Sequence, residues 1–198
     1  MTSRPRYAEL HAHSCYSFLD GASTPAELAA QAVELDLSAL ALTDHDGMYG
    51  VVQFSQAAKK VGLPTVFGSE LRFGSQLLLG ELGPRTGVPD PDGDQLLFLA
   101  RSPQGYRHLS AQIGLGHLRP GKKAPPQHSL TDIASGPQDQ LLLLTGGRKS
   151  RLRRTLQDPD LSRSDQFAAA RTELEKLKDL FGRQNVVVEI TATATAQD

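Results

Sequence analysis

The sequence predicts an α/β fold with mainly parallel strands. Short apolar runs alternate with segments whose apolar residues recur at helical spacing, which is the pattern of repeated strand and helix units. The chain has 198 residues, of which 39% are hydrophobic and 22% charged, and this is enough for one domain with a substantial core. Histidine or acidic residues accompany the first three predicted strands, at the rim where barrel-type α/β proteins build their active sites.

The first 70 residues repeat one plan of strand and helix. Thr24 and Glu27 form a capping-box pattern around Pro25, which predicts the start of a helix. Gly62 followed by Pro64 predicts the end of the next helix. The expected elements are strands over 7–11, 38–43 and 64–68, the last followed directly by Glu70, and helices over 24–35 and 51–61.

The second half of the chain carries weaker signals of the same kind. Ser102 and Pro103 predict the start of a helix whose apolar side includes Tyr106, Leu109 and Ile113. Segments rich in glycine and proline predict loops. The expected elements are strands over 76–82, 95–101, 140–145 and 185–190, a helix over 164–180, a loop over 83–94 and a mobile surface connection over 114–128.

Composition restricts the class of protein. The single cysteine, Cys15, excludes an internal disulfide and a cysteine-rich zinc finger, and it favours a reducing compartment, with the cytoplasm as the default location. We expect Cys15 to be a packed thiol and not a nucleophile. No apolar run approaches the roughly 18 residues of a membrane helix, and the first residues lead into a strand in place of a signal peptide. We therefore expect neither secretion nor a membrane partner.

Charge is unevenly distributed, although the formal net charge is only −1. The segment 148–154 holds five cations and no acid, so it could contact phosphate groups. It has no aromatic residue that could stack on bases. A solvated helix face, or a surface that docks another domain, is the favoured interpretation over direct contact with nucleic acid.

Histidines and carboxylates in the first 70 residues predict a metal centre. His11 and His13 lie two apart in a predicted strand, so both imidazoles are expected on one face. Together with Asp20, His45 and Glu70 they form a ligand set that suits zinc, manganese or iron, and such a set often holds more than one ion. Metal-assisted hydrolysis of a phosphate or amide bond is the first functional hypothesis.

The remaining candidates are weaker. Asp44 is either a ligand itself or a group that orients a ligating histidine from behind. Glu189, on the last predicted strand, is the remaining acid with the best chance of facing the site. His108, His117 and His128 are expected to be exposed to solvent.

Four segments resemble the opening motifs of the polymerase and histidinol phosphatase (PHP) domain. They are Ala8 to Ser14, Tyr16 to Ala22, Leu40 to Asp46 and Gly68 to Glu70, and the residues 101–106 and 144–149 are similar to the version that begins bacterial C-family DNA polymerases (DNA polymerase III alpha-like), especially the error-prone branch. The resemblance covers nearly the whole chain and is most specific over 7–71. It implies a distorted barrel of about seven parallel strand and helix units that holds up to three metal ions.

The resemblance also assigns ligands by motif. It implies that His11 and His13 bind one ion with Glu70, that Glu70 bridges to a second ion, and that Asp20 and His45 bind a third. Gln95 and Gly147 stand where relatives often carry a histidine and a cysteine, which would impair the middle site. The last motif of the family, an Asp-x-His, lies past residue 198. The chain is therefore expected to be an incomplete PHP barrel, without the closing strand and helix units, that holds fewer than three divalent ions.

Three functional hypotheses remain open. The first is the amino-terminal metal-binding module of an error-prone DNA polymerase, active in DNA replication or repair, with a phosphoesterase activity in which His11, His13, His45 and Glu70 act through the metal. Its partners would be the rest of the polymerase and, indirectly, DNA. The second is a non-catalytic structural module with a vestigial metal site. The third, a free-standing small PHP phosphatase, is the least favoured because the surrounding residues resemble the polymerases.

Overall fold

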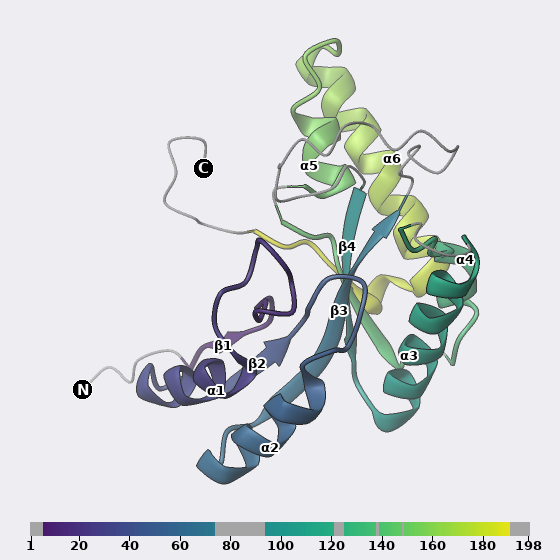
Figure 1. The fold of residues 1–198 in the computed structure, drawn as a ribbon. Coiled ribbons are helices and arrows are strands. Elements are labelled where there is room, and N and C mark those ends of the chain that lie inside the picture. Colours follow the sequence, from purple (N-terminus) through teal and green to yellow (C-terminus); the bar gives the residue numbers. More distant parts are fainter. Residues whose placement is uncertain (1–5, 74–93, 121–124, 138, 148, 191–198) are drawn as a thin grey trace.

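A computed structural model describes residues 6–73, 94–120, 125–137, 139–147 and 149–190. Within these ranges, six strands form one sheet in the order in which they occur along the chain, with helices packed against it (Figure 1). The predicted α/β fold is confirmed. The strands are β1 (Ala8–Glu9), β2 (Ala39–Leu42), β3 (Thr65–Phe73), β4 (Asp94–Ala100), β5 (Leu141–Leu144) and β6 (Val186–Val187). The helices are α1 (Pro25–Glu34), α2 (Val51–Val61), α3 (Pro103–Leu118), α4 (Leu130–Ala134), α5 (Arg151–Leu156) and α6 (Arg163–Phe181), with the short 3-10 helix η2 (Arg183–Asn185).

Most strand pairs are parallel, as predicted. The pairs β1 with β2, β2 with β3 and β5 with β6 are parallel, whereas β4 is antiparallel to both of its neighbours. An antiparallel pair needs no crossover helix between its strands. The strand predicted over 76–82 and the loop over 83–94 fall almost wholly outside the described residues.

Local sequence signals explain where the helices begin and end. The Thr24 side chain accepts a hydrogen bond from the Glu27 amide while Glu27 accepts one from the Thr24 amide, so the predicted capping box is present at α1. Gly62 ends α2 in the left-handed conformation, with φ of 72°. Ser102 caps α3. That helix continues to Leu118, so the first residues of the predicted surface connection are helical.

Both faces of the sheet are apolar. On the outer face, α1 and α2 pack over β2 and β3 around Phe54, and α3, α4 and α6 pack over β4 and β5 around Phe98 and Leu109. On the inner face, Ala41, Leu97 and other residues of β2, β4 and β5 form a separate cluster. No helix within the described ranges combines the length and the apolar character that a bilayer-spanning segment requires.

The sheet curls strongly. The strands β1 and β6 are its two opposite edges, yet the segment that follows β6, drawn in yellow, reaches the purple loop that follows β1 (Figure 1). The contact between His11 and Glu189 lies at this meeting point, with Nδ1 and Oε1 2.5 Å apart. The architecture is therefore a curled half-barrel whose interior is lined by the inner apolar cluster.

Three predicted strand boundaries need correction. The strand β1 ends at Glu9, so His11 and His13 follow the strand and do not belong to it. Glu70 lies inside β3, which runs on to Phe73 because β4 pairs with it along its whole second half. The strand β6 is only two residues long and does not fill the predicted range 185–190.

Candidate metal centre

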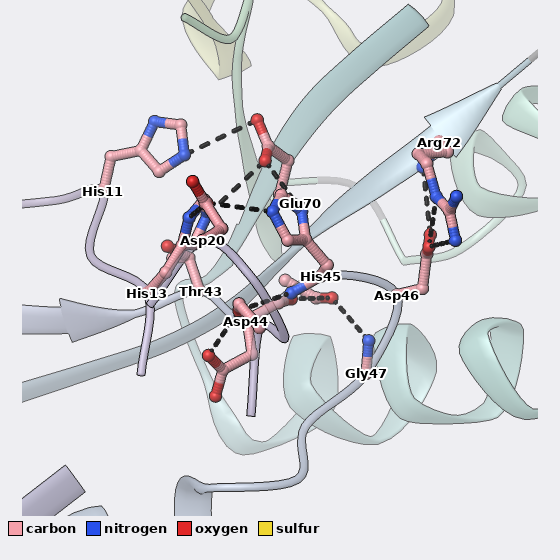
Figure 2. Close-up of polar contacts among 12 residues, drawn as sticks. His11, His13, Asp20, Thr43, Asp44, His45, Asp46, Gly47, Glu70 and Arg72 are labelled. Carbon is pink, nitrogen blue, oxygen red and sulfur yellow. Dashed lines mark hydrogen bonds and ion pairs between the residues drawn. The ribbon is translucent and has the colours of Figure 1, made fainter. Parts of the chain in front are cut away.

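Glu70 is the hub of a cluster of histidines at the rim of the half-barrel (Figure 2). It is 2% exposed. Its Oε1 lies 3.5 Å from His11 Nε2, and its Oε2 lies 3.4 Å from His13 Nε2 and 3.0 Å from His45 Nδ1. Three imidazoles, two from the loop after β1 and one from the loop after β2, therefore converge on one buried carboxylate.

The first three strands bring these side chains together. The loop after β1 runs beside the end of β2, because the Thr43 amide donates to the Ala12 carbonyl at 2.9 Å. His45 follows β2 and forms a parallel bridge with Glu70. The Glu70 amide in turn donates to the Thr43 carbonyl at 3.3 Å. The expected convergence of three strand ends on one rim is thus present, with the hub carboxylate inside the third strand.

Asp20 joins the cluster from the loop between β1 and α1. Its Oδ2 lies 3.1 Å from His45 Nε2 and in close contact with His13 Nδ1. His13 and His45 each present one ring nitrogen to Glu70 and the other to Asp20. Two overlapping sets of three groups result, each with ligand atoms within 4.8 Å of one another: His11, His13 and Glu70, and His13, Asp20 and His45.

Asp44 holds the loop that carries Asp20. Its buried carboxylate accepts hydrogen bonds from the Ser14 amide at 2.8 Å, from the Ser14 hydroxyl and from the Ser17 hydroxyl at 2.7 Å. The Ser17 hydroxyl also accepts a hydrogen bond from the His45 amide at 3.2 Å. The Asp44 carboxylate therefore bonds to the loop, while its backbone carbonyl accepts hydrogen bonds from the Ser69 hydroxyl and the Glu70 amide of β3.

Electrostatics tie the cluster together. Burial alone would raise the pKa of Glu70, but the three histidines that face its carboxylate hold that pKa well below its usual range. Burial opposes protonation of His11, yet the bonds to Glu189 and Glu70 raise its pKa to about 10. The pKa of His45 is likewise raised, against the effect of burial, by Glu70 and Asp20. The carboxylates thus stabilise positive charge within the cluster, whether protonated imidazoles or a bound cation carries it.

The geometry fits divalent ions. His13 Nε2 and His45 Nδ1 are buried and have no hydrogen-bond partner among the described residues, although both face Glu70 Oε2. An ion with metal–ligand bonds of 2.0–2.2 Å holds neighbouring ligand atoms about 2.8–3.5 Å apart. The distances from the three imidazoles to Glu70 lie between 3.0 and 3.5 Å. The donor set of nitrogen and carboxylate oxygen suits zinc, manganese or iron.

Glu189 also contacts the cluster, which the sequence indicates only weakly. Its side chain is 9% exposed, and Oε1 lies 2.5 Å from His11 Nδ1. Its amide donates to the Thr145 hydroxyl at 3.0 Å, which fixes the backbone beside the end of β5. The only sequence signal was its place on the last predicted strand, because a contact across 178 residues has no local pattern.

Several side chains outside the cluster differ from expectation. The side chain of His128 is fully buried, with Nε2 3.1 Å from Asp46 Oδ1, and half-buried His108 has Nε2 2.9 Å from the Ile133 carbonyl. The prediction of exposure is wrong for both, because each imidazole satisfies a polar group of a neighbouring segment. His117 is exposed as predicted. Cys15 is exposed, so the prediction of a packed thiol is also wrong.

The basic segment is partly neutralised by acids. Arg151 lies 3.6 Å from Asp94 and 3.2 Å from Glu173, and Arg154 lies 3.5 Å from Asp94. These pairs connect α5 to β4 and α6. The interpretation of this segment as a solvated helix face, or as a surface that docks another domain, stays a prediction.

The rim of the half-barrel gathers histidines and carboxylates, the ligand types that suit divalent metal ions. The chain belongs to the PHP domain family, whose sequence profile matches residues 9–193. The chain is 48% identical over 187 residues to an error-prone DNA polymerase from Mycolicibacterium paratuberculosis, and 47% identical over 186 residues to one from Cutibacterium acnes. Each match covers 93% of this chain but only 16% and 15% of the respective relative, so the chain spans about a sixth of their length.

A solved structure supports the fold. It is a protein from Bifidobacterium adolescentis that has been proposed to be a metal-dependent phosphoesterase, and it aligns with a TM-score of 0.52 over 94% of this chain and 87% of its own. The sequences are 14% identical, so the similarity concerns the fold alone.

Proposed function

We propose that the rim cluster binds divalent metal ions and hydrolyses phosphoesters. The observation that carries the proposal is the convergence of His11, His13 and His45 on buried Glu70 at distances that suit shared coordination. We expect the chain to bind fewer than three ions, because the described residues contain two overlapping ligand sets.

Each residue has a defined part in this proposal. His11, His13 and Glu70 would hold one ion, and Asp20 and His45 would hold another. Such ions lower the pKa of a water molecule towards neutrality and polarise a phosphoryl oxygen. Asp44 keeps the loop of Asp20 in place through Ser14 and Ser17. The low pKa of Glu70 keeps its carboxylate charged at neutral pH.

We further propose that the chain is the amino-terminal module of an error-prone DNA polymerase. The support is its identity of 46–48% to proteins of that name, of which it spans about a sixth. The rest of the polymerase would then supply the closing units of the barrel and contact DNA, and the protein would act in the cytoplasm on chromosomal DNA. The same relatives disfavour a free-standing small phosphatase.

A structural module without catalysis is the second candidate. It is favoured by Gln95 and Gly147, which occupy positions where the family often carries ligands. Gln95 is buried at the start of β4, where it pairs with Arg72 of β3. Its backbone amide donates a hydrogen bond to the Lys149 carbonyl. In this case the metal ions would only stabilise the half-barrel against which the polymerase packs.

Metal content and hydrolysis, measured together, distinguish these functions. The wild-type chain, loaded with manganese or zinc, is assayed with a generic phosphomonoester and phosphodiester, with and without chelator. We expect His13→Ala to reduce bound metal and turnover by at least about tenfold. Glu34→Ala, which removes an exposed acid at the end of α1, should change neither.

Each other outcome has a definite meaning. Unchanged metal content in His13→Ala would contradict the ligand assignment. Bound metal without turnover in the wild type would favour the structural module.

A further inference from the structure

His11 lies between two carboxylates, one in β3 and one in the segment that follows β6. Its Nε2 faces Glu70 of β3 at 3.5 Å, while its Nδ1 contacts Glu189, just after β6, at 2.5 Å. An ionised carboxylate can only accept a hydrogen bond, so the imidazole donates to Glu189 through Nδ1. This interaction leaves Nε2 as the nitrogen that is directed into the cluster.

Both the backbone and the side chain of Glu189 are held in place beside His11. Its amide is bound to the hydroxyl of Thr145, which is 1% exposed. Its side chain is more than nine-tenths buried, and Oε2 has no hydrogen-bond partner among the described residues. Burying a carboxylate is costly unless it is paired, so the contact with His11 stabilises the buried Glu189 side chain.

We propose that Glu189 is a positioning residue for His11, which makes metal binding dependent on the docking of β6. This inference rests on the proposed metal-binding function. A carboxylate that accepts the Nδ1 proton fixes the tautomer and the ring orientation of a ligating histidine, and it increases the basicity of the other nitrogen.

The contact between His11 and Glu189 also connects the two edges of the half-barrel. The strands β1 and β6 are opposite edges of the sheet, and the pair of His11 and Glu189 connects the segments that follow them. An ion bound through His11 Nε2 therefore favours the curled state in which the two edges meet.

A double-mutant cycle tests the proposal, with cobalt(II) as the probe because its visible absorption reports coordination. Cobalt is titrated into the metal-free wild type, Glu189→Ala, Glu189→Gln, His11→Ala and the double variant His11→Ala with Glu189→Ala. We expect Glu189→Ala to weaken cobalt binding about 10–100-fold. Glu189→Gln, whose amide oxygen can still accept the hydrogen bond, should lose less. In the His11→Ala background, Glu189→Ala should cause no further loss.

The controls separate the alternatives. Glu34→Ala, which removes an exposed acid at the end of α1, should bind as the wild type does. A wild type that binds no cobalt would overturn the proposed function. A wild type that binds, with Glu189→Ala unchanged in affinity and spectrum or with additive losses in the double variant, would overturn the role of Glu189 alone. If Glu189→Ala does not fold, by circular dichroism, the decision passes to Glu189→Gln, and its unchanged affinity would overturn the proposal.

Discussion

At the scale of single residues, buried acids organise both the centre and the loops around it. Glu70, Asp44 and Asp46 are each at most 4% exposed, and each is satisfied by different partners. Glu70 faces histidines, Asp44 accepts from serine groups, and Asp46 points away from the cluster towards Arg72 (Figure 2). The sequence placed these acids near one another but could not distinguish their partners, because Asp44 and Asp46 flank His45 symmetrically.

Asp46 provides a test that depends on pH. Burial would raise its pKa, but the bond to His128 and the charge of Arg72 lower it. Because the pKa of Asp46 is lower in the folded protein than in the unfolded chain, its charged carboxylate stabilises the fold at pH values above the unfolded pKa of 3.8. This stabilisation is lost as the pH falls through the pKa of the folded state. We expect Asp46→Asn to lower the free energy of unfolding by about 2 kcal/mol at pH 7, and by progressively less below pH 4.

Urea denaturation at a series of pH values measures this difference. Asparagine tolerates the left-handed backbone of Asp46, where φ is 49°, so the substitution adds little strain. Asp36→Asn is a matched control, since Asp36 is exposed and also has a positive φ, of 56°. It should change stability by less than about 0.5 kcal/mol. A loss at Asp46 that stays constant down to pH 3 would contradict the assigned pKa.

At the scale of elements, helices were predicted better than strands. The capping box of α1 and the glycine that ends α2 are local signals, so the sequence predicts the start of α1 and the end of α2 accurately. The limits of β1 and β3 depend on which neighbour each strand pairs with, and those pairs join distant parts of the chain. The antiparallel direction of β4 has the same cause, since no residue within that strand encodes it.

The cap of α1 can be tested directly. We expect Thr24→Ala to lower the free energy of unfolding by about 1 kcal/mol, because the Glu27 amide loses its acceptor. Thr172→Ala makes the same change at an exposed position inside α6, where alanine is the better helix former, so it should be neutral or slightly stabilising. Equal effects in thermal or urea unfolding would show that the cap does not stabilise α1.

At the scale of the whole molecule, curling of the sheet completes the site. The five predicted ligands all come from the first 70 residues, and the structure brings them together as expected. Glu189 joins them only because the opposite edge of the sheet returns to the loop after β1. Sequence motifs identified the residues that face the cluster, whereas the support behind His11 depends on curvature that no local pattern encodes.

The most direct test of the metal centre is anomalous diffraction from crystals of the chain grown with manganese or zinc. We predict strong peaks beside Glu70, within bonding distance of the His13 and His45 ring nitrogens that lack hydrogen-bond partners. His13→Ala crystals should show weaker peaks or none. A loaded wild-type crystal with no peak in the cluster, or with ions only at exposed histidines such as His117, would contradict the central claim that these residues bind metal.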